Sequence, residues 1–172
     1  MNTTPSPDSD ALPGAEKKTG KSRSRSARRW SRELALQSLY EWRIGGADAA
    51  QLEAHFYELE GHKQADHALF LTLIRGVLQE HPQLAEHLSD HLDRPFSELS
   101  PIEALLLLIA VYEFAHCPET PYRVVINEAI ELAKVYGGTD GHRYVNGVLD
   151  KVALKLRGQE VQGYKTTVEA AG

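Results

Sequence analysis

The sequence predicts an all-α protein, a single compact domain of about seven helices. Apolar residues recur at helical spacing from about residue 26 to residue 157, and no stretch alternates apolar and polar residues as a half-buried strand does. Most of the helical stretches are also bounded by a capping residue, a proline or a pair of glycines. At 172 residues the chain has the length of one domain, which can bury a core without a metal or a disulfide.

The first helix is predicted to begin after Ser26, which can cap it, and to end near Ile44, before Gly45-Gly46. One side of this helix carries Leu34, Ala35, Ser38, Leu39 and Trp42. A neighbouring sector, about 80° wide, carries Arg29, Arg32, Leu36, Tyr40 and Arg43. That sector is a basic stripe that contains an aromatic ring, beside a core face.

Three helices are predicted in the next part of the chain. Asp48 can cap the first, which turns Leu52, Phe56 and Leu59 inward. The second runs over about residues 66–80, with Leu69, Phe70, Leu73, Ile74, Val77 and Leu78 apolar. Pro82 then opens a short helix that carries Leu84, Leu88 and Leu92.

The clearest helix start follows Ser100, because Pro101 stands at the first helical position and Glu103 completes a capping box. This helix continues through LLLLIAVYEF, which is apolar on nearly all faces, and we expect it to be the central buried helix. Two further helices follow, over residues 122–136 and about 140–156, separated by Gly137-Gly138. The acidic residues along the first of these, Glu128 and Glu131, are predicted to form a solvated rim, although acids beside an apolar helix can also dock a basic protein.

Charge is distributed unevenly along the chain. Residues 17–32 hold eight Lys or Arg and no acid, whereas residues 33–172 carry a net charge of −10. Residues 1–25, rich in Ser, Pro, Asp, Gly and Lys, are predicted to be a disordered leader, and residues 158–172 a disordered tail. A basic arm on an acidic body is typical of nucleic-acid binding, while a solvated tail or a surface for an acidic protein are the alternatives.

The second candidate site is the segment GGTDGHRY, over residues 137–144. A helix N-terminus presents free N–H groups to anions, and an arginine and a tyrosine follow directly. The alternative is a plain turn between two helices, capped by Asp140. The segment lacks the spacing of phosphate-binding and dinucleotide-binding loops.

The sequence predicts no metal site, no cofactor and no catalytic activity. His87 and His91 are four residues apart but have no obvious third ligand, and no nucleophile motif is present. The single cysteine, Cys117, excludes an internal disulfide and favours a reducing compartment such as the cytoplasm. No secretory signal and no apolar run of membrane-spanning length is found.

Three stretches resemble the bacterial NusB family. They read ARRWSRELALQSLYEW (27–42), PYRVVINEAIELAKVYGG (121–138) and HRYVNGVLDKVA (142–153), and the resemblance covers about residues 26–157. It implies two packed helical subdomains and a non-enzymatic transcription antitermination factor. Members bind the boxA element of ribosomal RNA leader transcripts as a heterodimer with the ribosomal protein NusE, and join RNA polymerase with other Nus factors. Some members form homodimers that mask the RNA surface.

The resemblance also implies roles for particular residues. RNA contact is implied for Arg28, Arg29, Arg32, Tyr40, Asp140, Arg143 and Tyr144. Contact with NusE is implied for Glu98, Glu103, Tyr112 and Glu113. Trp30 stands where the family often has another arginine, so that one basic contact is replaced there by stacking or packing.

Two other functions are compatible with parts of this sequence. The first is a helical adaptor that binds only proteins, with the basic arm as a tail. The second is the RNA-binding module of a ribosomal RNA methyltransferase, in which a similar domain precedes the catalytic one. Only 15 residues follow Arg157, so we expect no catalytic domain in this chain.

Overall fold

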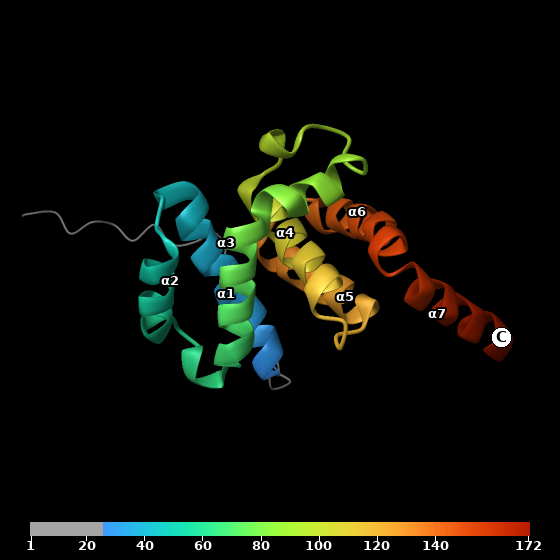
Figure 1. Ribbon diagram of the computed structural model, residues 1–172, viewed down its shortest axis with the longest axis horizontal. Coiled ribbons are helices and arrows are strands. Elements are labelled where there is room, and N and C mark those ends of the chain that lie inside the picture. The colour runs from blue at the N-terminus through green and yellow to red at the C-terminus, as the bar shows by residue number, and fades with distance from the viewer. Residues whose placement is uncertain (1–25) are drawn as a thin grey trace, which may run out of the picture.

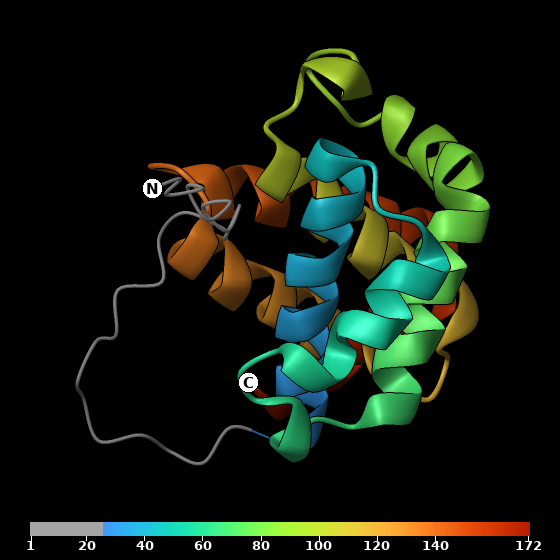
Figure 2. The same cartoon turned by 90° about the vertical axis from the view of Figure 1, so that its left-hand side faces the viewer.

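The computed structural model describes residues 26–172 as an assembly of helices (Figures 1 and 2). This part of the chain has seven α-helices, three short 3-10 helices and no strand, which confirms the all-α prediction. The α-helices are α1 (Ala27–Gly45), α2 (Ala49–His55), α3 (His67–Ser89), α4 (Pro101–His116), α5 (Tyr122–Tyr136), α6 (Gly141–Leu156) and α7 (Gly158–Ala171). The 3-10 helices are η1 (Phe56–Glu58), η2 (His62–Gln64) and η3 (Phe96–Glu98). The predicted leader, residues 1–25, lies outside the described residues.

Helix α4 lies at the centre, as its composition predicts. Nearly all of its length is buried, from Ile102 to Phe114, and it packs against α1, α3, α5 and α6. Ser100 caps it: the Ser100 hydroxyl accepts the Glu103 N–H at 3.4 Å and donates to the Glu103 carboxylate at 2.8 Å. Two groups of helices meet on it, α1 to α3 on one side and α5 with α6 on the other (Figure 1). None of the described helices is long and apolar enough to cross a bilayer.

The predicted helix break at Pro82 is wrong, because α3 continues through this residue to Ser89. Val77, Leu84 and Leu88 follow one face of the helix on both sides of the proline, and all three are buried. A proline inside a helix costs about 3 kcal/mol through its missing N–H and its ring. Burial of the leucines that follow offsets that cost, which the local sequence alone cannot show.

The structure also differs from the disordered tail predicted over residues 158–172. Residues 158–171 form α7, which packs on α6 and extends away from the body (Figure 1). Val161 is buried against the core, and the Tyr164 ring meets the edge of Tyr122. The Arg123 guanidinium lies 4.1 Å from the centre of the Tyr164 ring. These contacts come from α5, about 40 residues earlier, and they order a segment whose own apolar residues are few.

One arginine joins the end of α4 to the start of α7. The Arg157 side chain is only 8% exposed, and its guanidinium donates to four main-chain carbonyls at 2.7–3.1 Å. These are the carbonyls of Glu113, Phe114, Cys117 and Thr120. The same group pairs with Glu160 at 2.6 Å. The carbonyls of Glu113 and Cys117 also accept a main-chain N–H, from Cys117 and Thr120, so Arg157 adds a second, charged donor to each of these two.

Burial of the Cys117 thiol raises its pKa from 9.0 to about 11, with a further contribution from Glu113. The folded protein therefore holds this proton more tightly than the unfolded chain. Stability from this source is complete below about pH 9 and is lost as the pH rises to about 11. The loss amounts to roughly 2–3 kcal/mol.

Urea unfolding at pH 8.5 and pH 10.5 measures this loss. The fall in the free energy of unfolding is expected to be smaller in Cys117→Ala than in the wild type. The comparison removes the pH dependence that the two proteins share, so the difference reports the thiol together with its effect on Tyr112, whose pKa is raised by burial and also by the Cys117 charge. Equal falls in both proteins would contradict the assignment.

Candidate nucleic-acid interface

The first turn of α1 presents two arginines. Ser26 accepts the Arg29 N–H at 3.2 Å and so fixes where the helix begins. Arg28 donates to the Thr120 hydroxyl at 3.1 Å and lies 3.9 Å from the Asp66 carboxylate. Both guanidinium side chains remain about two-fifths exposed, so each keeps an edge toward solvent. This is the position that the helix start and the arginine motif predict.

Arg29 forms a two-pronged ion pair with Glu128 of α5. Its Nη2 and Nε atoms lie 2.9 and 3.0 Å from the two carboxylate oxygens. The hydrogen bonds that Arg29 donates to Glu128 raise the pKa of its guanidinium, which stays charged. The Glu128 side chain is only 12% exposed, so the predicted solvated rim is wrong at this residue. Glu131, the other predicted rim residue, is exposed and pairs with Lys134 on the same helix.

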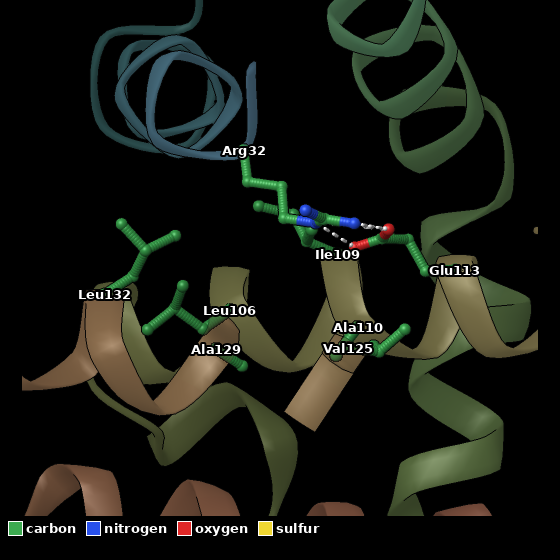
Figure 3. A pocket seen from close by; sticks show the side chains of 8 residues that line it. All are labelled: Arg32, Leu106, Ile109, Ala110, Glu113, Val125, Ala129 and Leu132. Carbon is green, nitrogen blue, oxygen red and sulfur yellow. Dashed lines mark hydrogen bonds and ion pairs between the residues drawn. The ribbon is translucent and has the colours of Figure 1, made fainter. Parts of the chain in front are cut away.

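Arg32 is inside the protein, not at its surface. Its side chain is 4% exposed, and it reaches from α1 to the carboxylate of Glu113 on α4, which is 1% exposed (Figure 3). The two N–O distances are 2.7 and 2.9 Å. Burial is the largest single influence and opposes the charge on Arg32, but the hydrogen bonds and the negative charge of Glu113, with a contribution from Glu128, together raise the pKa of the guanidinium. The surface positions that the resemblance implies for Arg32 and Glu113 are therefore not found, because this sector of α1 faces α4.

The rest of the predicted basic stripe is also divided by packing. Leu36 is fully buried, and Tyr40 is partly buried against the core. The Arg43 guanidinium lies 5.4 Å from the centre of the ring of Phe96, which begins η3 in the segment before α4. The stripe is therefore not one exposed face, and at the start of the helix its accessible cation is Arg29, next to Arg28, which lies outside the stripe.

Trp30 contributes packing. Its ring lies on Gly61, where an added Cβ would come within 2.3 Å of the indole. Gly61 also has a positive φ of 95°, which favours glycine. The tryptophan that replaces a family arginine thus anchors the start of α1 to the segment between η1 and η2.

The start of α6 forms a second cluster of the implied residues. Asp140 has a left-handed backbone with φ of 63°, and its side chain makes no capping hydrogen bond. Its carboxylate lies 3.7 Å from Arg143, and both side chains are well exposed. The predicted role of Asp140 as a side-chain cap is therefore wrong, because the positive φ turns the residue away from the geometry of a cap.

Two residues that the sequence did not single out complete this cluster. The Tyr144 hydroxyl donates to Asp93 at 3.1 Å, and the Arg94 guanidinium lies 5.4 Å from the centre of the Tyr144 ring. Burial raises the pKa of Tyr144, and the hydrogen bond to Asp93 adds to this. Arg94 in turn pairs with Asp93 at 2.9 Å. Asp93 and Arg94 carry no motif, and only the fold brings their loop against α6.

The residues implied to meet NusE do not form one patch. Glu98 is exposed in η3, and Glu103 lies against Gly141, where an added Cβ would come within 2.7 Å of its carboxylate. Tyr112 is further along α4 and packs on Gly76 instead. Glu103 thus borders the start of α6, so the surfaces implied for RNA and for the protein partner meet at this end.

The described residues give no sign of a metal centre or an active-site cavity at this interface. Across residues 26–172, no group of three or more His, Cys, Asp or Glu could hold a metal ion. The pocket beside Arg32 and Glu113 has a volume of about 10 Å³, the room of about one water molecule (Figure 3). The starts of α1 and α6 instead present charged side chains and aromatic rings.

Comparison with known proteins places this arrangement among transcription factors. A family model described as the NusB family matches residues 29–154. The transcription antitermination protein NusB of Dechloromonas aromatica (strain RCB) is 56% identical over 141 residues, which cover 82% of this chain and 86% of that protein. The protein of the same name from Burkholderia mallei (strain SAVP1) is 54% identical over 138 residues, 80% of this chain and 95% of that one.

Solved structures agree in fold. T. maritima NusB has a TM-score of 0.65 at 27% identity, covering 75% of this chain and 92% of that chain. NusB from a crystal structure of the antitermination factors NusB and NusE in complex with dsRNA has a TM-score of 0.63 at 21% identity. That match covers 72% of this chain and 93% of the other. Helix α7 lies beyond the residues that the family model matches.

Proposed function

This chain belongs to the NusB family, and we propose on that basis that it binds boxA-type single-stranded RNA together with the ribosomal protein NusE. In this role it helps RNA polymerase resist termination within a complex that contains other Nus factors, and it performs no catalysis. The observation that carries the proposal is the pair of half-exposed guanidinium groups, Arg28 and Arg29, at the start of α1 on an otherwise acidic body.

Each exposed group has a chemical task in this proposal. Arg28 and Arg29 bind phosphates, since a guanidinium matches the two-oxygen edge of a phosphate. Arg143 and Arg94 bind phosphates at the start of α6. The partly exposed ring of Tyr40 stacks on an unpaired base, as aromatic side chains do in single-strand recognition. Asp140 and Tyr144 shape the same surface. Arg32 acts indirectly, by holding α1 against α4.

The protein partner is proposed to meet the acidic end of this surface. Glu98 and Glu103 offer carboxylates that complement a basic ribosomal protein. A protein of the same fold was solved with NusE and dsRNA, which supports this partner. Because Glu103 borders the start of α6, RNA and NusE are expected to touch each other as well as this chain.

RNA binding over a salt series tests the proposal. Wild-type protein is expected to bind a boxA oligonucleotide more tightly than a scrambled one, and NusE is expected to sharpen that preference. Changing Arg28 and Arg29 together to alanine is expected to weaken boxA binding by about tenfold or more. The log–log salt slope should fall by about 0.7 for each lost phosphate contact.

The matched control changes two exposed cations elsewhere, Arg75 and Lys155, to alanine. Arg75 is a close match for Arg29, because it also forms a two-pronged ion pair, with Glu53. The control should bind boxA nearly as the wild type does. Equal binding of boxA and scrambled RNA would contradict the boxA proposal. RNA affinity unchanged by loss of Arg28 and Arg29 would favour the adaptor function instead.

A further inference from the structure

We propose that Glu128 is a built-in competitor for RNA phosphate at Arg29, so that an RNA phosphate must displace this carboxylate to take the Nε and Nη2 edge of the guanidinium. The inference rests on the proposed function and extends it. It makes Glu128, which has no assigned role in binding, a residue that sets how strongly RNA is held.

The geometry of the pair carries the inference. The carboxylate of Glu128 faces the Nε and Nη2 edge of Arg29 with both oxygens, at 2.9 and 3.0 Å. A phosphate presents two oxygens in the same way and would take the same edge. Arg29 is 42% exposed and Glu128 only 12%, so solvent and RNA approach from the arginine side. The Glu128 carboxylate thus lies on the protein side of the Arg29 guanidinium, away from solvent.

Neighbouring contacts keep α1 and α5 side by side. The Tyr136 hydroxyl, two turns further along α5, donates to Glu33 of α1 at 2.6 Å. Gln37, one turn along α1, donates to the same hydroxyl at 3.2 Å. The two helices thus run side by side, with Arg29 opposite Glu128 at one end and these bonds at the other. This packing places Glu128 of α5 opposite Arg29 of α1, and among the described residues no other hydrogen bond holds its carboxylate there.

The other two arginines of the motif are paired differently. Arg32 has a similar fork with Glu113, but both groups are buried and no RNA can reach them. Arg28 donates to the Thr120 hydroxyl at 3.1 Å, and its contact with a carboxylate, that of Asp66, is long at 3.9 Å, so no carboxylate forks its guanidinium. Among these three arginines, Arg29 alone combines a full fork with an edge open to solvent.

This arrangement has a consequence for the salt dependence of binding. A free arginine that binds a phosphate takes part in releasing counterions from the RNA, which steepens the log–log slope by about 0.7 for a single strand. When Glu128 is expelled by the phosphate, its uncovered charge recruits a cation and remains near the RNA. The recruited cation and the negative charge that remains near the RNA both lower the affinity for RNA and flatten the log–log slope. Removing the charge of Glu128 is expected to reverse them.

The test compares Glu128→Gln with Glu131→Gln in binding to boxA RNA over a salt series. Glu131 is one turn further along α5 and pairs with Lys134, so the control removes the same charge from the same helix. Glu128→Gln is expected to bind about threefold to fivefold more tightly than wild type, the equilibrium ratio that corresponds to a half-exposed ion pair. Its slope should steepen by about 0.7. The control should change affinity by less than about twofold.

Two further variants decide whether the gain acts through Arg29. Arg29→Ala is measured alone and combined with Glu128→Gln, and the gain is expected to vanish when Arg29 is absent. A gain that persists would show a general field effect and overturn the inference. Equal affinities for Glu128→Gln and Glu131→Gln would also overturn it. They would show that the ion pair of Arg29 with Glu128 only holds α1 against α5.

The outcome for the proposed function is read separately. If wild type does not prefer boxA over scrambled RNA, the boxA proposal fails, while an Arg29-dependent gain from Glu128→Gln on both RNAs still supports the competitor. If wild type prefers boxA and Glu128→Gln changes nothing, the function stands and the competitor fails. Binding of RNA by neither protein would overturn both.

Discussion

Replacing Arg157 with alanine is expected to lower the free energy of unfolding by about 3–5 kcal/mol, because it removes several hydrogen bonds from a charged donor, each of which contributes about 1.5–3 kcal/mol. Four main-chain carbonyls and the Glu160 carboxylate would lose their common donor. The hydrogen bonds involve a charged group, which makes each stronger than a neutral one. Helix α7 would also lose its link to α4. Urea unfolding followed by circular dichroism measures the change.

Two other variants at this position separate charge from geometry. Arg157→Lys keeps the charge, but a single ammonium cannot reach all the carbonyls that the guanidinium serves, so an intermediate loss is expected. Glu160→Gln removes only the ion pair and is expected to cost less than about 1 kcal/mol. A loss below about 1 kcal/mol for Arg157→Ala would show that water replaces the guanidinium at little cost.

Replacing Glu113 with alanine is expected to have a similarly large effect, about 3–5 kcal/mol, because it leaves the Arg32 guanidinium buried without its partner. Removing both charges is expected to cost far less. In Arg32→Met combined with Glu113→Leu, apolar side chains of similar size occupy the same space between α1 and α4. Such replacements of buried pairs are often neutral or stabilising. Unfolding by urea gives the free energies for the single and double variants.

The same double variant decides the role of Arg32. If Arg32 acts only by holding α1 in place, a folded double variant is expected to bind boxA RNA within about twofold of wild type. If Arg32 leaves the interior to contact RNA, its loss should weaken binding as strongly as Arg29→Ala does. The ratio of these two affinities, measured at one salt concentration, distinguishes direct contact from support.

Much of the candidate interface was predictable from local sequence. Arg28 and Arg29 follow a capping serine at the start of a helix, and a residue in the first turn has few neighbours to cover it. Asp140 and Arg143 follow the glycine turn at residues 137–138 and lie at the start of another helix, where side chains are again usually exposed. The residues that modify these groups could not be predicted in the same way. Glu128 pairs with Arg29 across 99 residues of sequence, and Asp93 with Tyr144 across 51.

Helix ends show the same division. The starts of α1 and α4 and both ends of α5 follow from caps, prolines and glycines, and they lie within a residue or two of the predicted positions. The continuation of α3 through Pro82 and the formation of α7 do not follow from such signals. Both depend on contacts with distant helices, which offset a locally unfavourable sequence.

Four properties could be predicted along the chain: the helical class, the central place of α4, the exposure of the arginines at the start of α1 and the family. These properties depend on periodicity, caps and motifs, which are local and can be read along the chain. The tertiary structure alone decided that Arg32 is buried against Glu113, that Glu128 occupies the edge of Arg29, and that Asp93 and Arg94 meet Tyr144. An ion pair or a ring contact needs two groups within a few ångströms, and only packing of the helices brings residues so far apart in sequence to that distance.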